Sequence, residues 1–103
     1  MKVYFVYILR CSDASYYTGI TNDVEQRISD HNAGIDPDSY TFSRRPVELC
    51  YTASFKNPNE AIAFEKQIKG WSRKKKEALI EGNWNKIQQE AECKNVSHYR
   101  NKP

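Results

Sequence analysis

The first part of the chain alternates between β-favouring and polar stretches. Residues 3–10 are almost all β-branched, aromatic or aliphatic, residues 11–15 are polar, and residues 16–20 return to the β-favouring pattern. Two such stretches joined by a short polar break are typical of a β-hairpin. We therefore predict a hairpin whose loop is the polar break.

The register of this hairpin places two tyrosines on one face. With the loop at 11–15, Tyr7 should face Gly19 and Leu9 should face Tyr17. Tyr7 and Tyr17 then share a face, because alternate residues of a strand point the same way. Since Gly19 has no side chain, we expect open space across from the Tyr7 ring, as a small pocket at the sheet surface requires.

A helix should follow the hairpin. Asn22 is a suitable N-cap for a helix from Asp23 to about Asn32, Glu25 would close a capping box, and Gly34 suits the C-terminal cap. The apolar seam of this helix has two nitrogen-bearing side chains beside it, Arg27 and His31, which lie one turn apart and could point at a ligand.

The remaining pattern predicts one more strand and two more helices. Pro, Asp and Ser between residues 35 and 46 indicate a loop, and a third strand should cover 47–55. A helix should begin near Asn57 and reach about Lys69. Ser72 can cap a further helix through roughly residue 81.

Composition sets the class of protein. The chain has 103 residues, 39% hydrophobic and 28% charged, which is ordinary for one globular domain. We expect a domain over 1–85 and a polar, partly disordered C-terminal tail over 86–103. Three cysteines without CxxC spacing favour neither a disulfide framework nor a zinc ribbon. With no signal or membrane-spanning run, we expect a soluble, cytoplasmic monomer or weak dimer.

Charge points to nucleic acid. The net charge is only +3, yet residues 66–76 carry six Lys or Arg and no acid. Consecutive cations at the start of a helix oppose its dipole, so stability alone does not explain them. A solvated basic surface is the simpler alternative, but clustered cations favour phosphate contact. The candidate DNA-binding residues are Arg44, Arg45, Lys66, Lys69, Arg73, Lys74, Lys75 and Lys76.

Five polar residues have the chemistry of a phosphodiesterase. Tyr7, Tyr17, Arg27, His31 and Glu65 offer two phenols, a guanidinium, an imidazole and a carboxylate. A carboxylate can hold a divalent cation, an arginine can offset charge on phosphorus, and a tyrosinate can take a proton from water.

The same residues carry a resemblance to a known family. Val6-Tyr7-Ile8, then Tyr17-Thr18-Gly19, then the arginine, histidine and glutamate stand in the order of the GIY-YIG nuclease superfamily. The likeness covers residues 3 to about 82 and is greatest to small, stand-alone bacterial members. The first triplet lacks its glycine, the second has threonine for isoleucine, and the asparagine that several members carry has no clear match.

The resemblance implies both a fold and an activity. The fold would be α/β (α+β), a three-stranded antiparallel sheet flanked by helices in the order ββαβαα. The activity would be hydrolysis of DNA with one metal ion, Mg²⁺ or Mn²⁺, in repair or processing and on branched or flapped forms. Target choice would rest on DNA shape or on a protein partner.

The resemblance also implies a role for each residue. Tyr7 would be the general base, Tyr17 would position water or phosphate, and Arg27 would stabilise the pentavalent transition state. His31 would hydrogen-bond near the attacked phosphate, and Glu65 would bind the metal ion. Gly19 would be a structural part of the signature.

Three alternatives stay open on the sequence alone. Glu65 could form only an exposed ion pair with Lys69 at the next turn, worth about 0.3–0.5 kcal/mol. The chain could be a non-catalytic nucleic-acid-binding module with a degenerate site. It could also be an interaction domain whose basic helix docks on an acidic protein.

Overall fold

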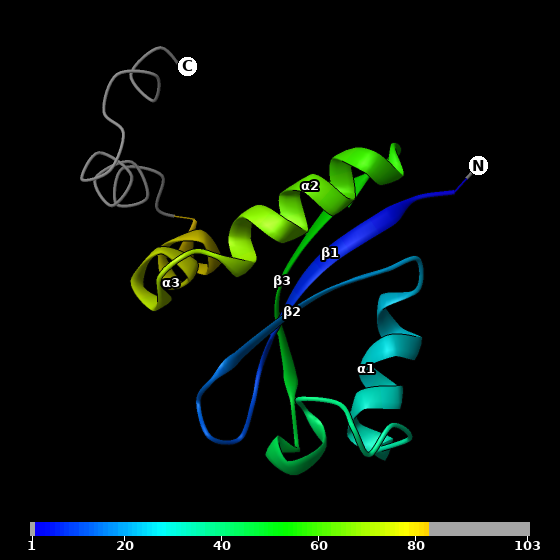
Figure 1. Cartoon of the computed structure of the whole chain (residues 1–103), viewed down its shortest axis with the longest axis vertical. Coiled ribbons are helices and arrows are strands. Elements are labelled where there is room, and N and C mark those ends of the chain that lie inside the picture. Colours follow the sequence, from blue (N-terminus) through cyan, green and yellow to red (C-terminus); the bar gives the residue numbers. More distant parts are fainter. Residues whose placement is uncertain (1, 83–103) are drawn as a thin grey trace. The chain divides into compact units, whose positions relative to one another are not determined.

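The computed structural model describes residues 2–82. Their elements are β1 (Tyr4–Arg10), β2 (Tyr16–Thr21), α1 (Val24–Ala33), the 3₁₀ turn η1 (Phe42–Arg44), β3 (Glu48–Phe55), α2 (Pro58–Lys69) and α3 (Arg73–Glu81), shown in Figure 1. This is the expected order ββαβαα. Within the described range, no helix has the length and apolar character needed to cross a membrane.

The described residues divide into two compact units, which meet between Lys69 and Gly70 in the sequence. The sheet, α1 and α2 belong to the first unit, and α3 belongs to the second. The expected domain end at 85 and the expected tail over 86–103 lie outside the described residues.

The sheet is antiparallel throughout, in the order β2-β1-β3. The predicted hairpin register is confirmed, since Tyr7 pairs with Gly19 and Leu9 pairs with Tyr17. The pairing of β1 with β3 contains a register shift between Ile8 and Leu9, where the partners jump from Tyr51 to Leu49. Such bulges arise from a single extra residue and leave no pattern in the sequence that would have predicted this one.

The two faces of β1 bury different sets of side chains. Tyr7 and Leu9 form one buried cluster with Cys11 and Val47, against which Tyr17 and Ile28 of α1 pack. Val6 and Ile8 are also fully buried and point to the other face. Helix α2 contacts all three strands and lies on the opposite side of the sheet from α1 (Figure 1). The sheet is thus covered on both faces.

Helix α1 begins one residue later than its sequence suggested. The N-cap is Asp23 and not Asn22, because the Asp23 backbone is extended and its carboxylate accepts a hydrogen bond from the Gln26 amide at 3.1 Å. The expected capping box with Glu25 therefore does not form. Gly34 does end the helix, with a left-handed φ of 67° that glycine adopts at little cost.

Helix α3 follows its sequence signals closely. The Ser72 hydroxyl caps it by accepting a hydrogen bond from the Lys75 amide, and Gly82 ends it with a φ of 75°. Ala78 and Leu79 are buried, as expected of packing residues.

Candidate active site

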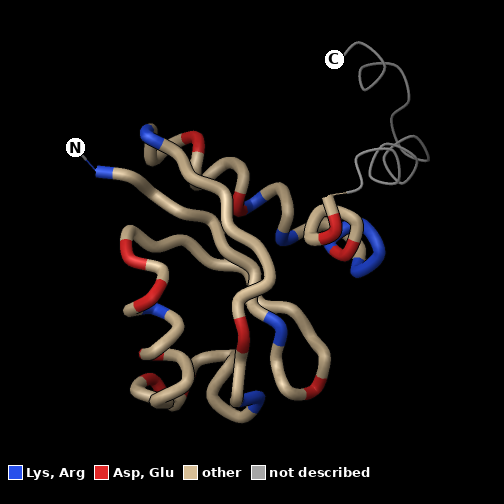
Figure 2. Tube along the Cα trace, turned by 180° about the vertical axis from the view of Figure 1, so that it is seen from behind, with Lys and Arg blue, Asp and Glu red and all other residues tan. Residues whose placement is uncertain are grey.

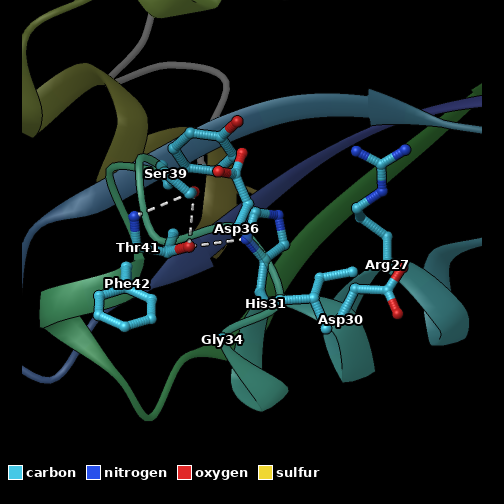
Figure 3. A pocket seen from close by; sticks show the side chains of 10 residues that line it. Arg27, Asp30, His31, Gly34, Asp36, Ser39, Thr41 and Phe42 are labelled. Atoms are coloured by element: carbon cyan, nitrogen blue, oxygen red, sulfur yellow. Dashed lines mark hydrogen bonds between the residues drawn. The ribbon is translucent and has the colours of Figure 1, made fainter.

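A pocket of about 340 Å³ lies between α1 and the loop that follows it. Tyr17 of β2 lines this pocket together with Arg27 and His31 of α1, and the loop supplies Ser39 and Thr41 (Figure 3). Three of the five residues that the sequence singled out thus border one concavity.

Tyr7 lies beside this pocket and is hydrogen-bonded to His31, one of the residues that line it. Its hydroxyl oxygen is 3.1 Å from Nε2 of His31, and the residue is only 1% exposed. The Tyr17 ring lies 6.3 Å from the Tyr7 ring and 5.2 Å from the His31 ring, measured between centroids. The expected shared face of the two tyrosines is confirmed, and His31 joins them.

The expectation of open space above Gly19 is wrong. A Cβ atom on Gly19 would lie 2.5 Å from the hydroxyl oxygen and 2.6 Å from Cζ of Tyr7. The Tyr7 ring itself therefore fills the space that the missing side chain leaves. Gly19 makes room for the phenol, and the pocket lies farther along, against α1.

Burial and nearby charges set the protonation of Tyr7 and His31. Burial raises the pKa of Tyr7 to about 12, helped by Tyr17 and opposed by the positive charge of Arg27. Burial, together with Arg27, lowers the pKa of His31, while Asp30 opposes that shift. At neutral pH the pair is therefore a neutral phenol beside a neutral imidazole.

Glu65 lies on α2 and is engaged by a neighbour. Its carboxylate forms an ion pair of 2.7 Å with the Lys69 ammonium group, and its side chain is 14% exposed. The structure therefore contains the Glu65–Lys69 ion pair that the sequence left open as an alternative. Glu65 is not among the residues lining the pocket, yet its charge contributes to the raised pKa of Tyr7. Tyr17 likewise contributes to the raised pKa of Lys69. The ion pair thus lies within electrostatic range of both tyrosines.

The donor set around Glu65 fits one kind of metal site. Within residues 2–82, no group of three or more His, Cys, Asp or Glu side chains converges as a metal cage. A site built on Glu65 would have one carboxylate ligand, with water and substrate oxygens completing the shell. Mg²⁺ is commonly held in this way, through one or two carboxylates and a phosphate-bearing substrate.

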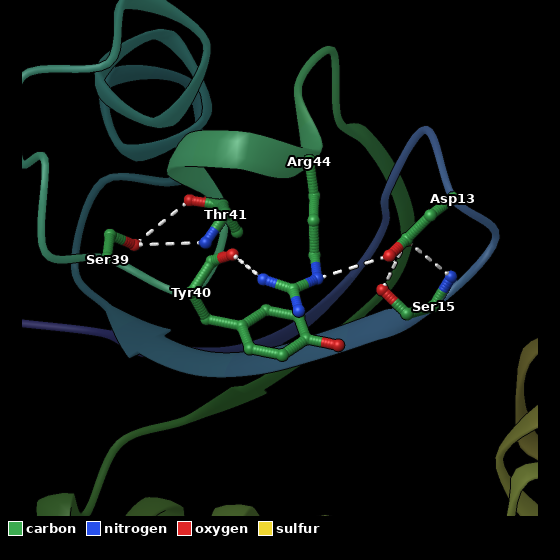
Figure 4. A network of polar contacts seen from close by, with 6 residues as sticks. All are labelled: Asp13, Ser15, Ser39, Tyr40, Thr41 and Arg44. Atoms are coloured by element: carbon green, nitrogen blue, oxygen red, sulfur yellow. Dashed lines mark hydrogen bonds and ion pairs between the residues drawn. The ribbon is translucent and has the colours of Figure 1, made fainter.

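Two candidate DNA-binding residues already have partners within the protein. Arg44 and Arg45 form contacts that stabilise the loop after α1. Arg44 forms an ion pair of 3.1 Å with Asp13, donates to the Tyr40 carbonyl at 2.7 Å and lies 3.9 Å from the centroid of the Tyr40 ring (Figure 4). Arg45 donates to the Phe42 carbonyl at 2.7 Å and lies over the Phe42 ring. Arg44 thus joins the hairpin loop to the pocket loop, whereas Arg45 links the pocket loop to the end of α1 through the Asn32 carbonyl.

Basic residues cluster at the start of α3 (Figure 2). Two of these side chains are engaged by neighbours. Arg73 pairs with Glu77 at 3.1 Å, and the Lys75 ammonium lies 4.2 Å from the centroid of a Trp71 ring. Lys75 is 9% exposed, which does not favour phosphate contact by that side chain. Burial lowers the pKa of Lys76.

Two candidate cations are open to a ligand. Lys66 and Lys74 are exposed and form no ion pair within the described range. Phosphate contact by these two side chains stays a prediction. The pocket itself is not uniformly basic, since Asp30 and Asp36 line it together with Arg27.

Sequence reasoning missed the contribution of the loop after α1. Thr41 is fully buried, and its hydroxyl lies 2.7 Å from Nδ1 of His31. Tyr40 stacks on Tyr17 with 6.1 Å between centroids and 22° between planes. The only signal was a run of hydroxyl-bearing residues at 39–41 in a segment rich in turn formers. Which hydroxyl would meet His31 depends on the path of the loop, which no local pattern gives.

Comparison with known proteins finds relatives that are similar over most of the chain. A UPF0213 protein of Halobacterium salinarum is 49% identical over 78 residues, which cover 76% of this chain and 100% of that protein. A UPF0213 protein of Staphylococcus haemolyticus is 47% identical over 81 residues, 79% of this chain and 98% of the relative.

Two solution NMR structures resemble the chain. The UPF0213 protein of Bacillus halodurans matches with a TM-score of 0.51 and 43% identity over 77% of this chain and 83% of that one. A protein of E. faecalis matches with a TM-score of 0.57 and 34% identity over 80% and 86%. Residues 3–78 match the GIY-YIG catalytic domain, so the chain belongs to the GIY-YIG family.

Proposed function

We propose that the protein is a metal-dependent endonuclease that hydrolyses phosphodiester bonds in DNA. The observation that supports this most is the gathering of Tyr7, Tyr17, Arg27 and His31 around one pocket in a chain of the GIY-YIG family. Unrelated structural roles would not require all four side chains to meet at one place.

Each residue at the pocket would have a separate role in the reaction. Arg27 would stabilise the negative charge that develops on the attacked phosphate, since a guanidinium offers several donors in a fixed plane. Tyr17, which lines the pocket, would position the phosphate or the attacking water. Tyr7 would receive a proton from that water, with His31 as its hydrogen-bond partner.

Glu65 would hold the metal ion, Mg²⁺ or Mn²⁺. When bound, such an ion polarises the phosphoryl oxygen and neutralises charge on the leaving group. Because the Lys69 ammonium now pairs with the Glu65 carboxylate at 2.7 Å, this ion pair would have to open first. The Lys69 ammonium is 55% exposed, so water can solvate it when the pair opens, and the bound metal ion would take its place beside the Glu65 carboxylate.

The exposed cations would bind the DNA backbone. Lys66 and Lys74 have no competing ion pair in the described part of the chain, so each is suited to a phosphate. Contacts of this kind carry no sequence information. Selection of branched or flapped DNA in repair or processing, if it occurs, would therefore depend on DNA shape or on a protein partner.

A cleavage assay with a matched control tests the proposal. Wild type, Glu65→Gln and Glu60→Gln are compared on duplex, single-stranded, branched and flapped DNA, with Mg²⁺ or with chelator. Glu60 lies on the same helix and is exposed. We expect metal-dependent cleavage by wild type and Glu60→Gln, and a loss of roughly 100-fold or more in Glu65→Gln.

One observation favours a second candidate function. The Glu65–Lys69 ion pair and the neutral state of Tyr7 would also suit a nucleic-acid-binding module that has lost turnover. Salt-dependent DNA binding by wild type, with no cleavage of any DNA form, would select that alternative.

A further inference from the structure

We propose that Thr41 is a positioning residue whose buried hydroxyl fixes the tautomer of His31. In that tautomer the proton of the imidazole is on Nδ1 and is donated to Thr41, so that Nε2 is free to accept the proton of Tyr7. The loop after α1 would in this way prepare the proton acceptor of the site.

The geometry places His31 between two hydroxyl groups. Its Nε2 lies 3.1 Å from the Tyr7 hydroxyl oxygen, and its Nδ1 lies 2.7 Å from Oγ1 of Thr41. Ser39 extends the chain, with its Oγ 3.0 Å from Oγ1 of Thr41 (Figure 3). A neutral imidazole carries one N–H, so it can donate to only one of its two neighbours.

The Tyr7 hydroxyl favours the same tautomer as Thr41, with the hydrogen on Nδ1. A neutral phenol carries a hydrogen that needs an acceptor, and at 1% exposure Tyr7 has too little contact with solvent for bulk water to be that acceptor. Among residues 2–82, Nε2 of His31 is the acceptor within hydrogen-bond distance of this hydroxyl, whereas the Arg27 guanidinium can only donate. If Nε2 carried the hydrogen, the buried phenol would lose its acceptor, and an unsatisfied group of this kind is strongly disfavoured.

Thr41 can accept the Nδ1–H hydrogen bond because its own hydroxyl hydrogen can be donated to a different residue. Its hydroxyl can donate to Oγ of Ser39, which also accepts the backbone N–H of Thr41 at 3.3 Å. Thr41 is fully buried, so its hydroxyl cannot turn to solvent. Donors therefore run in one direction, from Tyr7 to His31, from His31 to Thr41, and from Thr41 to Ser39.

The consequence for catalysis rests on the proposed function. As the oxygen of the attacking water bonds to phosphorus, its proton passes to the Tyr7 oxygen while the proton of Tyr7 passes to Nε2 of His31. The bond from phosphorus to the leaving oxygen breaks, and that oxygen takes a proton from solvent. His31 becomes an imidazolium ion, which keeps its Nδ1 hydrogen bond to Thr41. Tyr7 thus needs no prior ionisation to act as a base.

The tautomer can be measured without any cleavage assay. Imidazole ¹⁵N NMR of full-length protein distinguishes a protonated from an unprotonated ring nitrogen, and a His31→Gln spectrum separates His31 from the second of the two histidines. We expect Nδ1 to be protonated in wild type and in Thr41→Ser. In Thr41→Val the Nδ1 hydrogen has no acceptor, so either tautomer leaves one buried hydrogen unpaired, and we expect a measurable fraction of the hydrogen on Nε2.

A buried threonine in the sheet provides the matched control. The Thr18 hydroxyl oxygen is buried and has no hydrogen-bond partner in the described part of the chain. Thr18→Val therefore removes a hydroxyl without removing a hydrogen bond, and the His31 spectrum should not change. In single-turnover cleavage, Thr41→Val should be slower by roughly 10- to 100-fold at similar KM, with recovery in Thr41→Ser.

The outcomes separate this proposal from the proposed function. Protonated Nε2 in wild type would overturn the tautomer assignment, even if Thr41→Val cannot fold. An unchanged tautomer in a folded Thr41→Val would overturn the role of Thr41. The expected spectra in a protein that cleaves no DNA would support the assignment and contradict only the nuclease function.

Discussion

Gly19 faces Tyr7 across the hairpin, and its missing side chain gives the Tyr7 ring its place. A Cβ atom at Gly19 would lie 2.5 Å from the Tyr7 hydroxyl oxygen. Because both residues sit on paired strands, the ring and not the backbone should move in Gly19→Ala. We expect a loss of stability of about 1–3 kcal/mol in denaturant unfolding, and loss of the Tyr7–His31 hydrogen bond.

A double-mutant cycle isolates this contact. If the clash with the ring is the cause, Gly19→Ala should cost much less stability in a Tyr7→Ala background. Additive effects of the two substitutions would mean that Gly19 is required for another reason.

The raised pKa of Tyr7 predicts a pH dependence of stability. The folded pKa of about 12 lies above the ordinary tyrosine pKa of 10.0, so the unfolded state loses this proton first as pH rises. The stabilisation is fully present below pH 10 and is lost between pH 10 and about 12. Relative to Tyr7→Phe, the unfolding free energy of wild type should fall by on the order of 2–3 kcal/mol across that range. A difference that stays constant to the alkaline limit would contradict the burial of this phenol.

The Glu65–Lys69 ion pair predicts competition with a metal ion. Removing the ammonium group in Lys69→Gln should tighten Mg²⁺ or Mn²⁺ binding several-fold, because the carboxylate no longer has a cation beside it. Lys66→Gln on the same helix is the control, since Lys66 forms no ion pair in residues 2–82. NMR titration with the metal ion measures the affinity. Binding that persists in Glu65→Gln would place the ion elsewhere.

The contacts of Arg44 predict a role in structure and not in DNA binding. Arg44→Ala should release the Tyr40 ring that stacks on Tyr17, so we expect slower cleavage with an unchanged Kd for DNA. Asp13→Asn distinguishes a structural Arg44 from a phosphate-binding Arg44. If Arg44 binds phosphate, the protein should bind DNA more tightly once the acidic partner of Arg44 is gone. Fluorescence anisotropy with labelled DNA measures both Kd values.

Lys66 and Lys74, unlike Arg44, are predicted to contribute to DNA binding. Each is exposed without an ion pair in the described range, so Lys66→Ala and Lys74→Ala should weaken binding to all DNA sequences alike. The slope of log K against log salt should fall by about 1 for each lost phosphate contact. Unchanged affinity and slope would remove that residue from the DNA-binding surface.

Local rules were sufficient for much of the fold. The loop length of the first hairpin fixed which residues of β1 and β2 pair, and so predicted that Tyr7 and Tyr17 share a face. The cap of α1 was misplaced by one residue, because Asn and Asp are about equally favoured as N-caps and the backbone geometry selects Asp23. The signature residues were found because they follow the family order along the chain.

Long-range geometry accounts for what the sequence did not predict. The contact of Thr41 with His31 depends on the course of a twelve-residue loop over 35–46, which has no periodic pattern. The partners of Arg44 and Arg45 depend on the same loop. A count of cations predicted a basic surface, but it did not reveal that Arg44 and Arg73 form ion pairs. The pair of Lys69 with Glu65 was foreseen as an alternative, because the two residues lie one helical turn apart.

The most direct test of the central claim is the single-turnover rate of DNA cleavage in Mg²⁺ for Tyr7→Phe beside Tyr51→Phe. Tyr51 pairs with Ile8, and therefore lies on the other face of the sheet from Tyr7. We predict cleavage by wild type and Tyr51→Phe at similar rates, and a loss of roughly 100-fold or more in Tyr7→Phe. Wild-type protein that cleaves no DNA form, or Tyr7→Phe with the wild-type rate, would contradict the account.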